Sequence, residues 1–252
     1  MKKIRKIGTY LLDVALMTRL FWQEKKDAKV DFFGKPFVVP NGDIKSFALL
    51  FWEIVEKNQY HVELIKEHDI VFDAGANIGI FSILAAVKNP HATIYAFEPT
   101  PETYAARKEN TKHYPNIKTF NCALGESDGE ANLIIDVIPE SNYLEDRNLG
   151  GGILRRTHHF FRRIFSGVSV IMKTIDGMGT RVDFLKMDTE GYEANILKGA
   201  AETIKKYKPT IVMSAYHKPG DKTELPKLLN SMVPYACELH SDGEEDLICK
   251  AK

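Results

Sequence analysis

The feature that most constrains the fold is a short apolar run that ends in an acidic residue and a glycine-rich turn. The segment IVFDAGANIG occupies residues 70–79, and residues 78–87 then show the spacing of a helix. A strand that passes through a glycine turn directly into a helix is the first half of a βαβ unit, which builds parallel sheets. The sequence therefore predicts an α/β fold with a mostly parallel sheet.

The same alternation continues along the chain. Residues 235–239 and 247–250 flank a Ser-Asp-Gly turn, which predicts an antiparallel hairpin at the end of the sheet. Other strands are expected at 92–97, 117–122, 182–187 and 210–215, with helices at 102–113, 192–206 and 221–229.

The N-terminal quarter follows a different pattern. Residues 29–39 read as two short strands around a Gly-Lys-Pro turn, and 44–66 carry apolar residues at helical spacing. We therefore expect residues 1–66 to form a helical and hairpin extension, and 67–252 to form the main domain.

Composition limits the partners and the location. The formal net charge is zero, from 34 Lys and Arg against 34 Asp and Glu, which argues against a nucleic-acid partner. No run of 18 apolar residues exists, so no transmembrane segment is predicted. The three scattered cysteines, Cys122, Cys237 and Cys249, are expected to be buried thiols in a reducing compartment. Since the basic N-terminus also lacks the features of a signal peptide, a cytoplasmic location is expected.

The glycine turn constrains the ligand. Gly75 and Gly79 permit close backbone approach, but Asn77 stands where the dinucleotide fingerprint requires its second glycine. No Lys-Ser or Lys-Thr pair follows, as a P-loop would need. Asp73 places a carboxylate at the strand end, which suits a cationic group such as the amino group of S-adenosylmethionine better than a phosphate.

The ends of the next two strands complete a nucleoside site. Glu98 follows the glycine turn by about 20 residues, the spacing at which an acidic residue accepts ribose hydroxyls. Cys122 and Ala123, at the end of the third strand, are placed where an adenine could be held.

Several segments together resemble the FkbM family of S-adenosylmethionine-dependent methyltransferases. They are VFDAGANIG, FEP, ALGESDGE, LKMDTEGYEANILKGA and AYHKPGD, and the resemblance runs from about residue 32 to the C-terminus. It implies a Rossmann-like class I fold, a seven-stranded sheet with a reversed final strand, and O-methylation of sugars or polyketide-like molecules. It also marks Asp73, Gly75, Asn77, Gly79 and Glu98 as matches to the cofactor motifs.

Catalytic candidates lie after the fourth and fifth strands. Asp188 and Glu190 alternate by two, so both point to one side of an extended segment, where they could bind sugar hydroxyls, share a proton or hold a metal. Lys186 could pair with a carboxylate. His217 could act as a base, because an ordinary imidazole titrates at ~6.5. The sequence carries no dedicated metal signature; a hard ion such as Mg²⁺ is left open.

One connection is longer than usual. Residues 125–181 contain expected strands at 131–137 and 168–174, with an insertion at 138–167. Within it, the basic and aromatic segment 150–165 could recruit an anionic acceptor, contact a charged membrane surface, or pack in a homo-oligomer interface.

The leading hypothesis is therefore an O-methyltransferase acting on a saccharide or another small molecule. A nicotinamide-dependent oxidoreductase, an RNA methyltransferase and a non-catalytic nucleoside-binding module on the same fold are the alternatives.

Overall fold

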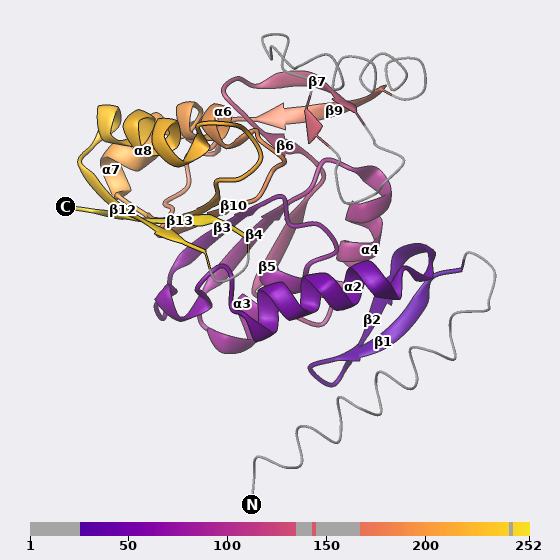
Figure 1. The fold of residues 1–252 in the computed structure, drawn as a ribbon. Helices are drawn as coiled ribbons and strands as arrows, with labels where there is room; N and C mark the ends of the chain where they lie inside the picture. Colours follow the sequence, from indigo (N-terminus) through magenta and orange to yellow (C-terminus); the bar gives the residue numbers. More distant parts are fainter. Residues whose placement is uncertain (1–25, 135–142, 145–166, 242–243) are drawn as a thin grey trace, which may run out of the picture.

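A seven-stranded sheet forms the centre of the protein, as Figure 1 shows for the computed structural model. The structure describes residues 26–134, 143–144, 167–241 and 244–252. In spatial order the strands are β12 (Tyr235–His240), β13 (Asp246–Ala251), β11 (Thr210–Ser214), β10 (Phe184–Met187), β3 (Ile70–Ala74), β4 (Thr93–Phe97) and β5 (Ile117–Phe120).

The sheet has the predicted topology. Strands β11, β10, β3, β4 and β5 pair in parallel, whereas β13 pairs antiparallel with both β11 and β12. This confirms the parallel sheet and its reversed C-terminal hairpin. The carboxyl ends of β3, β4 and β10 meet at one edge, where open α/β sheets bind ligands.

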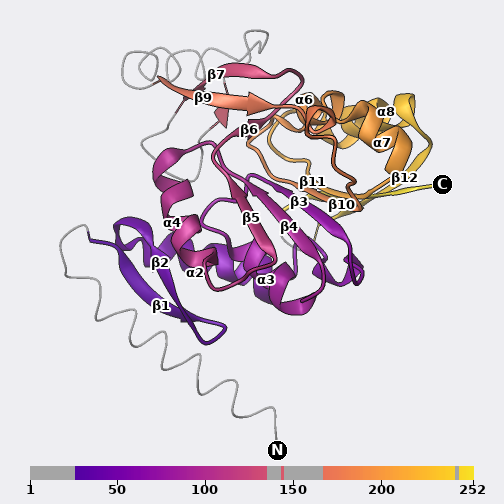
Figure 2. The same cartoon turned by 180° about the vertical axis from the view of Figure 1, so that it is seen from behind.

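Both faces of the sheet are covered because successive strand residues point to opposite sides. Val71 belongs to one buried cluster and its neighbour Phe72 to the other, and Phe184 and Leu185 divide in the same way. Figures 1 and 2 show helices α6, α7 and α8 on one face, and α2 and α3 on the other. Their bounds are α2 (Ile44–Phe51), α3 (Ile80–Lys88), α4 (Pro101–Thr111), α6 (Glu193–Lys198), α7 (Ala201–Tyr207) and α8 (Asp221–Met232).

The N-terminal hairpin is confirmed, but the helix after it is shorter than expected. Strands β1 (Ala28–Phe32) and β2 (Lys35–Val39) pair antiparallel. Helix α2 continues as a π-helical segment at Trp52–Glu56 and then ends, because Asn58 and His61 adopt left-handed backbone conformations that no helix can contain. A 3₁₀ turn at Val62–Leu64 leads to β3.

A second small sheet lies beside the carboxyl edge. Its strands are β6 (Ala123–Leu124), β9 (Gly167–Lys173), β7 (Gly129–Ile134) and β8 (Tyr143–Leu144), in that spatial order. This confirms the two strands expected near 131–137 and 168–174. The basic segment 150–165 and the first 25 residues lie outside the described residues.

The expectation of three free thiols is wrong for two of the cysteines. Cys237 and Cys249 form a disulfide, and Cys122 is free and buried. The two bonded residues lie directly opposite one another in the β12–β13 register, a relation that their sequence spacing alone does not reveal. Cysteine usage therefore no longer supports a reducing compartment. Within the described ranges, no helix is long and apolar enough to cross a membrane.

The expected helix over 192–206 is divided in two at Gly199. A methyl group on Gly199 would lie 1.9 Å from the carbonyl oxygen of Gly125, so the chain turns where two backbones touch. We predict that Gly199→Ala lowers the free energy of unfolding by about 2 kcal/mol or more, because the overlap is with backbone atoms. Denaturant unfolding measures this value.

Gly167→Ala is the matched control, since nothing lies within 4 Å of its added methyl group. It should change stability by less than about 0.5 kcal/mol. Equal effects of the two substitutions would contradict the close approach.

Candidate active site

A buried ion pair shapes the glycine turn. Lys186 and Asp73 are neighbours in the β10–β3 register, and Lys186 Nζ lies 3.1 Å from Asp73 Oδ1. Ser82 Oγ donates to the other oxygen of Asp73 at 2.5 Å, and Lys186 Nζ donates to the carbonyl of Gly75 at 2.9 Å. Asp73 is fully buried and does not line the cavity at this edge, so its expected contact with a cofactor amino group is not what the geometry offers.

The cavity, of about 260 Å³, opens at the carboxyl edge between the glycine turn and the ends of β4 and β10. Most of the predicted cofactor residues reach it: Gly75, Asn77, Glu98, Cys122 and Ala123. Gly79 does not line it. Instead, Gly79 begins helix α3 with a φ of 100°, a conformation that favours glycine.

Glu98 is held in place by the backbone. One carboxylate oxygen accepts the N–H of Asn77 at 3.0 Å, and the other accepts the N–H of Thr100 at 3.0 Å. A carboxylate offers about four lone-pair sites, so each oxygen can still accept a ligand hydroxyl. Asn77 has a φ of 47°, which asparagine tolerates better than most residues, and this explains a non-glycine at the centre of the turn.

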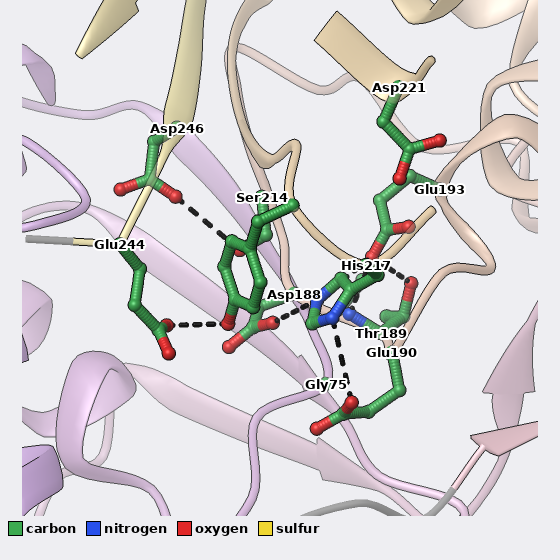
Figure 3. A network of polar contacts seen from close by, with 12 residues as sticks. Gly75, Asp188, Thr189, Glu190, Glu193, Ser214, His217, Asp221, Glu244 and Asp246 are labelled. Atoms are coloured by element: carbon green, nitrogen blue, oxygen red, sulfur yellow. Dashed lines mark hydrogen bonds and ion pairs between the residues drawn. The ribbon is translucent and has the colours of Figure 1, made fainter. Parts of the chain in front are cut away.

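The other end of the cavity carries Asp188 and Glu190, which follow β10 (Figure 3). Asp188 Oδ1 lies 3.1 Å from His217 Nε2, and Oδ2 accepts the hydroxyl of Tyr60 at 2.7 Å. The donors and cations around Asp188, His217 first among them, hold its pKa well below the usual range despite burial. Asp188 is therefore an anion at any working pH.

His217 lies behind these carboxylates and does not line the cavity. Its Nδ1 is 3.5 Å from Glu190 Oε2, and its Nε2 is 3.9 Å from Glu193 Oε1 (Figure 3). Burial works against the charged imidazole, but the bond to Asp188 and the nearby carboxylates raise its pKa to about 9. A pKa raised in this way favours the protonated ring, which argues against His217 as the base near neutrality, and its catalytic role stays a prediction.

The pKa of Glu190 lies in the range that a general base needs. Burial, reinforced by the charges of Asp188 and Glu193, raises its pKa to about 7, although the cation of His217 works in the opposite direction. Its side chain is one-third exposed to the cavity side of the turn, and its backbone is left-handed with a φ of 56°. Among the predicted catalytic residues, Glu190 is thus the one poised to exchange a proton near pH 7.

Three donor groups could be considered for a metal ion, since atoms of Asp188, Glu193 and His217 lie within 4.8 Å of one another. The polar atoms of these three side chains already have partners, within the group or at Thr189. The proton on His217 faces Asp188, and Glu193 accepts both the N–H and the hydroxyl of Thr189. The same donor atoms could hold an ion or share the proton of an imidazolium, and no step below uses a metal.

Sequence reasoning missed part of the cavity wall. Glu53 and Tyr60 come from the N-terminal extension, Tyr216 follows β11, and Glu244 lies between β12 and β13. Burial and the neighbouring carboxylates raise the pKa of Glu53 to about 7. Only Tyr216 had a local sequence signal, which is its position next to His217. Glu53, Tyr60 and Glu244 reach the cavity through tertiary packing.

Comparison with known proteins bears on the class of the protein. The model of the methyltransferase FkbM domain matches residues 73–240. A 31-O-demethyl-FK506 methyltransferase of Streptomyces tacrolimicus is 28% identical over 177 residues, 61% of this chain and 68% of the relative. A hexuronic acid methyltransferase of Haloferax volcanii is 25% identical over 177 residues, 67% of this chain and 64% of the relative.

Among solved structures, a methyltransferase FkbM from Methylobacillus flagellatus aligns with a TM-score of 0.52 at 21% identity. The alignment covers 80% of this chain but only about half, 52%, of that protein, and it supports the fold alone.

The sheet order and the match together define an S-adenosylmethionine-dependent methyltransferase with a Rossmann-like class I fold. Within that class, the chain belongs to the FkbM methyltransferase family. The alternatives of a nicotinamide-dependent oxidoreductase and a non-catalytic module are therefore set aside.

The raised pKa of His217 predicts a pH-dependent stability. Its contribution is fully present below the unfolded pKa of ~6.5 and is lost as the pH rises through about 9. We expect the stability difference between the wild type and His217→Gln to be about 3 kcal/mol larger at pH 6 than at pH 10. Denaturant unfolding at the two pH values measures it.

His91→Gln serves as the control, because His91 is mostly exposed and lies 3.7 Å from Glu67. Its stability difference should hardly vary with pH. A difference for His217→Gln that is equally flat would show that folding does not raise the pKa of His217.

Proposed function

We propose that the protein transfers the methyl group of S-adenosylmethionine to a hydroxyl of a saccharide or another polyhydroxylated small molecule. The observation that carries this proposal is a single cavity with Glu98 at one end and Glu190 at the other. Glu98 would accept the ribose hydroxyls, and Cys122 and Ala123 would hold the adenine. Asp188 and Glu190 would provide negative charge beside the sulfonium.

The chain's own residues align and deprotonate the acceptor. The acceptor hydroxyl donates to Glu190, which takes its proton while the new C–O bond forms and the C–S bond breaks, leaving S-adenosylhomocysteine. Asp188, held from both sides by Tyr60 and His217, accepts a second hydroxyl and fixes the direction of attack. S-adenosylmethionine supplies the methyl group and the leaving group.

The charge of the wall supports a neutral acceptor. Carboxylates of Glu53, Asp188, Glu190 and Glu244 line the acceptor end, and within the described residues the cavity has one lysine or arginine, Lys186, which is paired with Asp73. Carboxylates accept hydrogen bonds from sugar hydroxyls but repel an acidic sugar. The anionic acceptor expected from the basic segment 150–165 gains no support from this wall.

Substitution of Glu190 tests the chemistry. Glu190→Gln keeps the shape of the side chain and removes the base, so we expect kcat to fall ~10²-fold or more. In the wild type, kcat/KM should rise with pH through about 7, the pKa of Glu190, and this rise should be absent from the variant. Initial rates of methyl transfer between pH 5.5 and 9 measure both effects.

Glu126→Gln is the matched control, since Glu126 is exposed, pairs with Lys198 and does not line the cavity. It should leave the rate and its pH profile unchanged. A Glu190→Gln enzyme with wild-type turnover would remove Glu190 from the mechanism.

A matched acceptor pair tests the substrate class. We expect neutral methyl glycosides to be methylated with a kcat/KM at least ~10-fold above that of the corresponding uronic acids, because a carboxylate acceptor would enter an acidic wall. Transfer of a radiolabelled methyl group is the measurement, with a structured RNA as a third acceptor. A preference for the uronic acid or for RNA would overturn the proposed acceptor.

A further inference from the structure

Arg107 is a buried cation that the mechanism above does not use. It lies in helix α4, is fully buried and does not line the cavity. Its Nη2 donates to the carbonyl of Phe120 at 3.1 Å, whereas its Nε and Nη1 have no partner in the described part of the chain. Burying a guanidinium with one hydrogen bond is costly, and an apolar side chain of similar size would often be as stable or more so.

The guanidinium stands directly behind the cofactor end of the cavity. The carbonyl of Phe120 that accepts from Arg107 also accepts the backbone N–H of Glu98, at 3.1 Å. On the other side, a methyl group on Gly79 would lie 3.1 Å from Cγ of Arg107. Arg107 thus binds the carbonyl that also binds the backbone of Glu98, and it packs closely against Gly79, the residue that closes the glycine turn.

The charges around Arg107 identify Glu98 as the carboxylate that its positive charge stabilises. Burial lowers the pKa of Arg107, and the nearby carboxylates of Glu98 and Asp73 oppose this shift. Asp73 already has Lys186 as its counterion at 3.1 Å. Glu98, by contrast, has its two oxygens held by backbone N–H groups, which carry no full charge.

We propose that Arg107 is a positioning residue for cofactor binding: it anchors the end of β4 through Phe120 and supplies a positive charge behind Glu98, which accepts two ribose hydroxyls. The proposal rests on the proposed function, because it takes Glu98 as the ribose ligand. It assigns a role to the two guanidinium nitrogens without protein partners, which supply positive potential at Glu98 from inside the core.

Calorimetric titration with S-adenosylhomocysteine, at pH 8 and at pH 5.5, tests this proposal without an acceptor. Arg107→Met keeps the length of the side chain and removes the charge. Loss of the cation removes a positive potential that favours the ionised over the protonated form of a carboxylate, so the variant should bind the nucleoside less tightly, and this loss should grow as the pH falls. We expect the affinity of Arg107→Met to fall about tenfold more than that of the wild type between pH 8 and pH 5.5.

Further variants separate positioning from folding. Arg107→Lys retains the charge and should keep the wild-type pH profile, which a purely structural role would not require. Arg107→Gln provides a second neutral variant if Arg107→Met does not fold. In a Glu98→Gln background, Arg107→Met should cause little further loss, because the residue through which it acts is already neutral. Arg181→Met, at an exposed arginine paired with Asp183, is the control.

The outcomes are distinct. If the wild type binds S-adenosylhomocysteine and the neutral Arg107 variants bind it equally well at both pH values, the role of Arg107 is overturned while the proposed function stands. If Arg107→Lys is as pH-sensitive as Arg107→Met, the charge is not what matters and the proposal also fails. If the wild type itself does not bind S-adenosylhomocysteine, the proposed function is contradicted, and the role of Arg107 is contradicted with it.

Discussion

The buried pair between Asp73 and Lys186 is the interaction on which the rest of the site depends. It joins the ends of two neighbouring parallel strands, with side chains that are 0% and 3% exposed. Lys186 also binds the carbonyl of Gly75, so the same ammonium that neutralises Asp73 determines the path of the glycine turn. Breaking such a pair by removing one partner typically costs about 3–5 kcal/mol, which ties the shape of the cavity to the stability of the sheet.

Beyond this pair, the carboxyl edge carries several carboxylates and the imidazole of His217. Carboxylates outnumber cations on the acceptor side, and one imidazolium, His217, lies within 4 Å of three of them. His217 does not interact equally with the three carboxylates. Asp188 lies 3.1 Å from His217 and accepts the hydroxyl of Tyr60, and its pKa is lowered. Glu190 is more distant from His217, at 3.5 Å, and its pKa is raised to about 7. The unequal sharing of one cation gives two adjacent carboxylates different chemical roles.

Much of this could be predicted from sequence because it follows from local pattern and from one rule of topology. The glycine turn, Glu98 and the pair Asp188 and Glu190 follow buried strands, and the carboxyl ends of parallel strands must meet at one edge. The orientation of Asp73 could not be predicted in this way. It depends on the side chain of Lys186, which reaches across from the neighbouring strand in the folded sheet.

The other differences have the same origin in tertiary contact. Glu53 and Tyr60 lie in a segment whose apolar spacing indicated only a packing helix, yet they form one wall of the cavity. The charge of His217 is set by three carboxylates from another part of the chain. The break at Gly199 and the disulfide of Cys237 with Cys249 depend on which backbones and strands become neighbours.

The most direct test of the account is a crystal structure of the protein with S-adenosylhomocysteine bound. The account predicts that both ribose hydroxyls lie within hydrogen-bond distance of Glu98, that the adenine lies against Cys122 and Ala123, and that the sulfur faces Asp188 and Glu190. A nucleoside bound outside this cavity, or a sulfur directed away from Glu190, would contradict it.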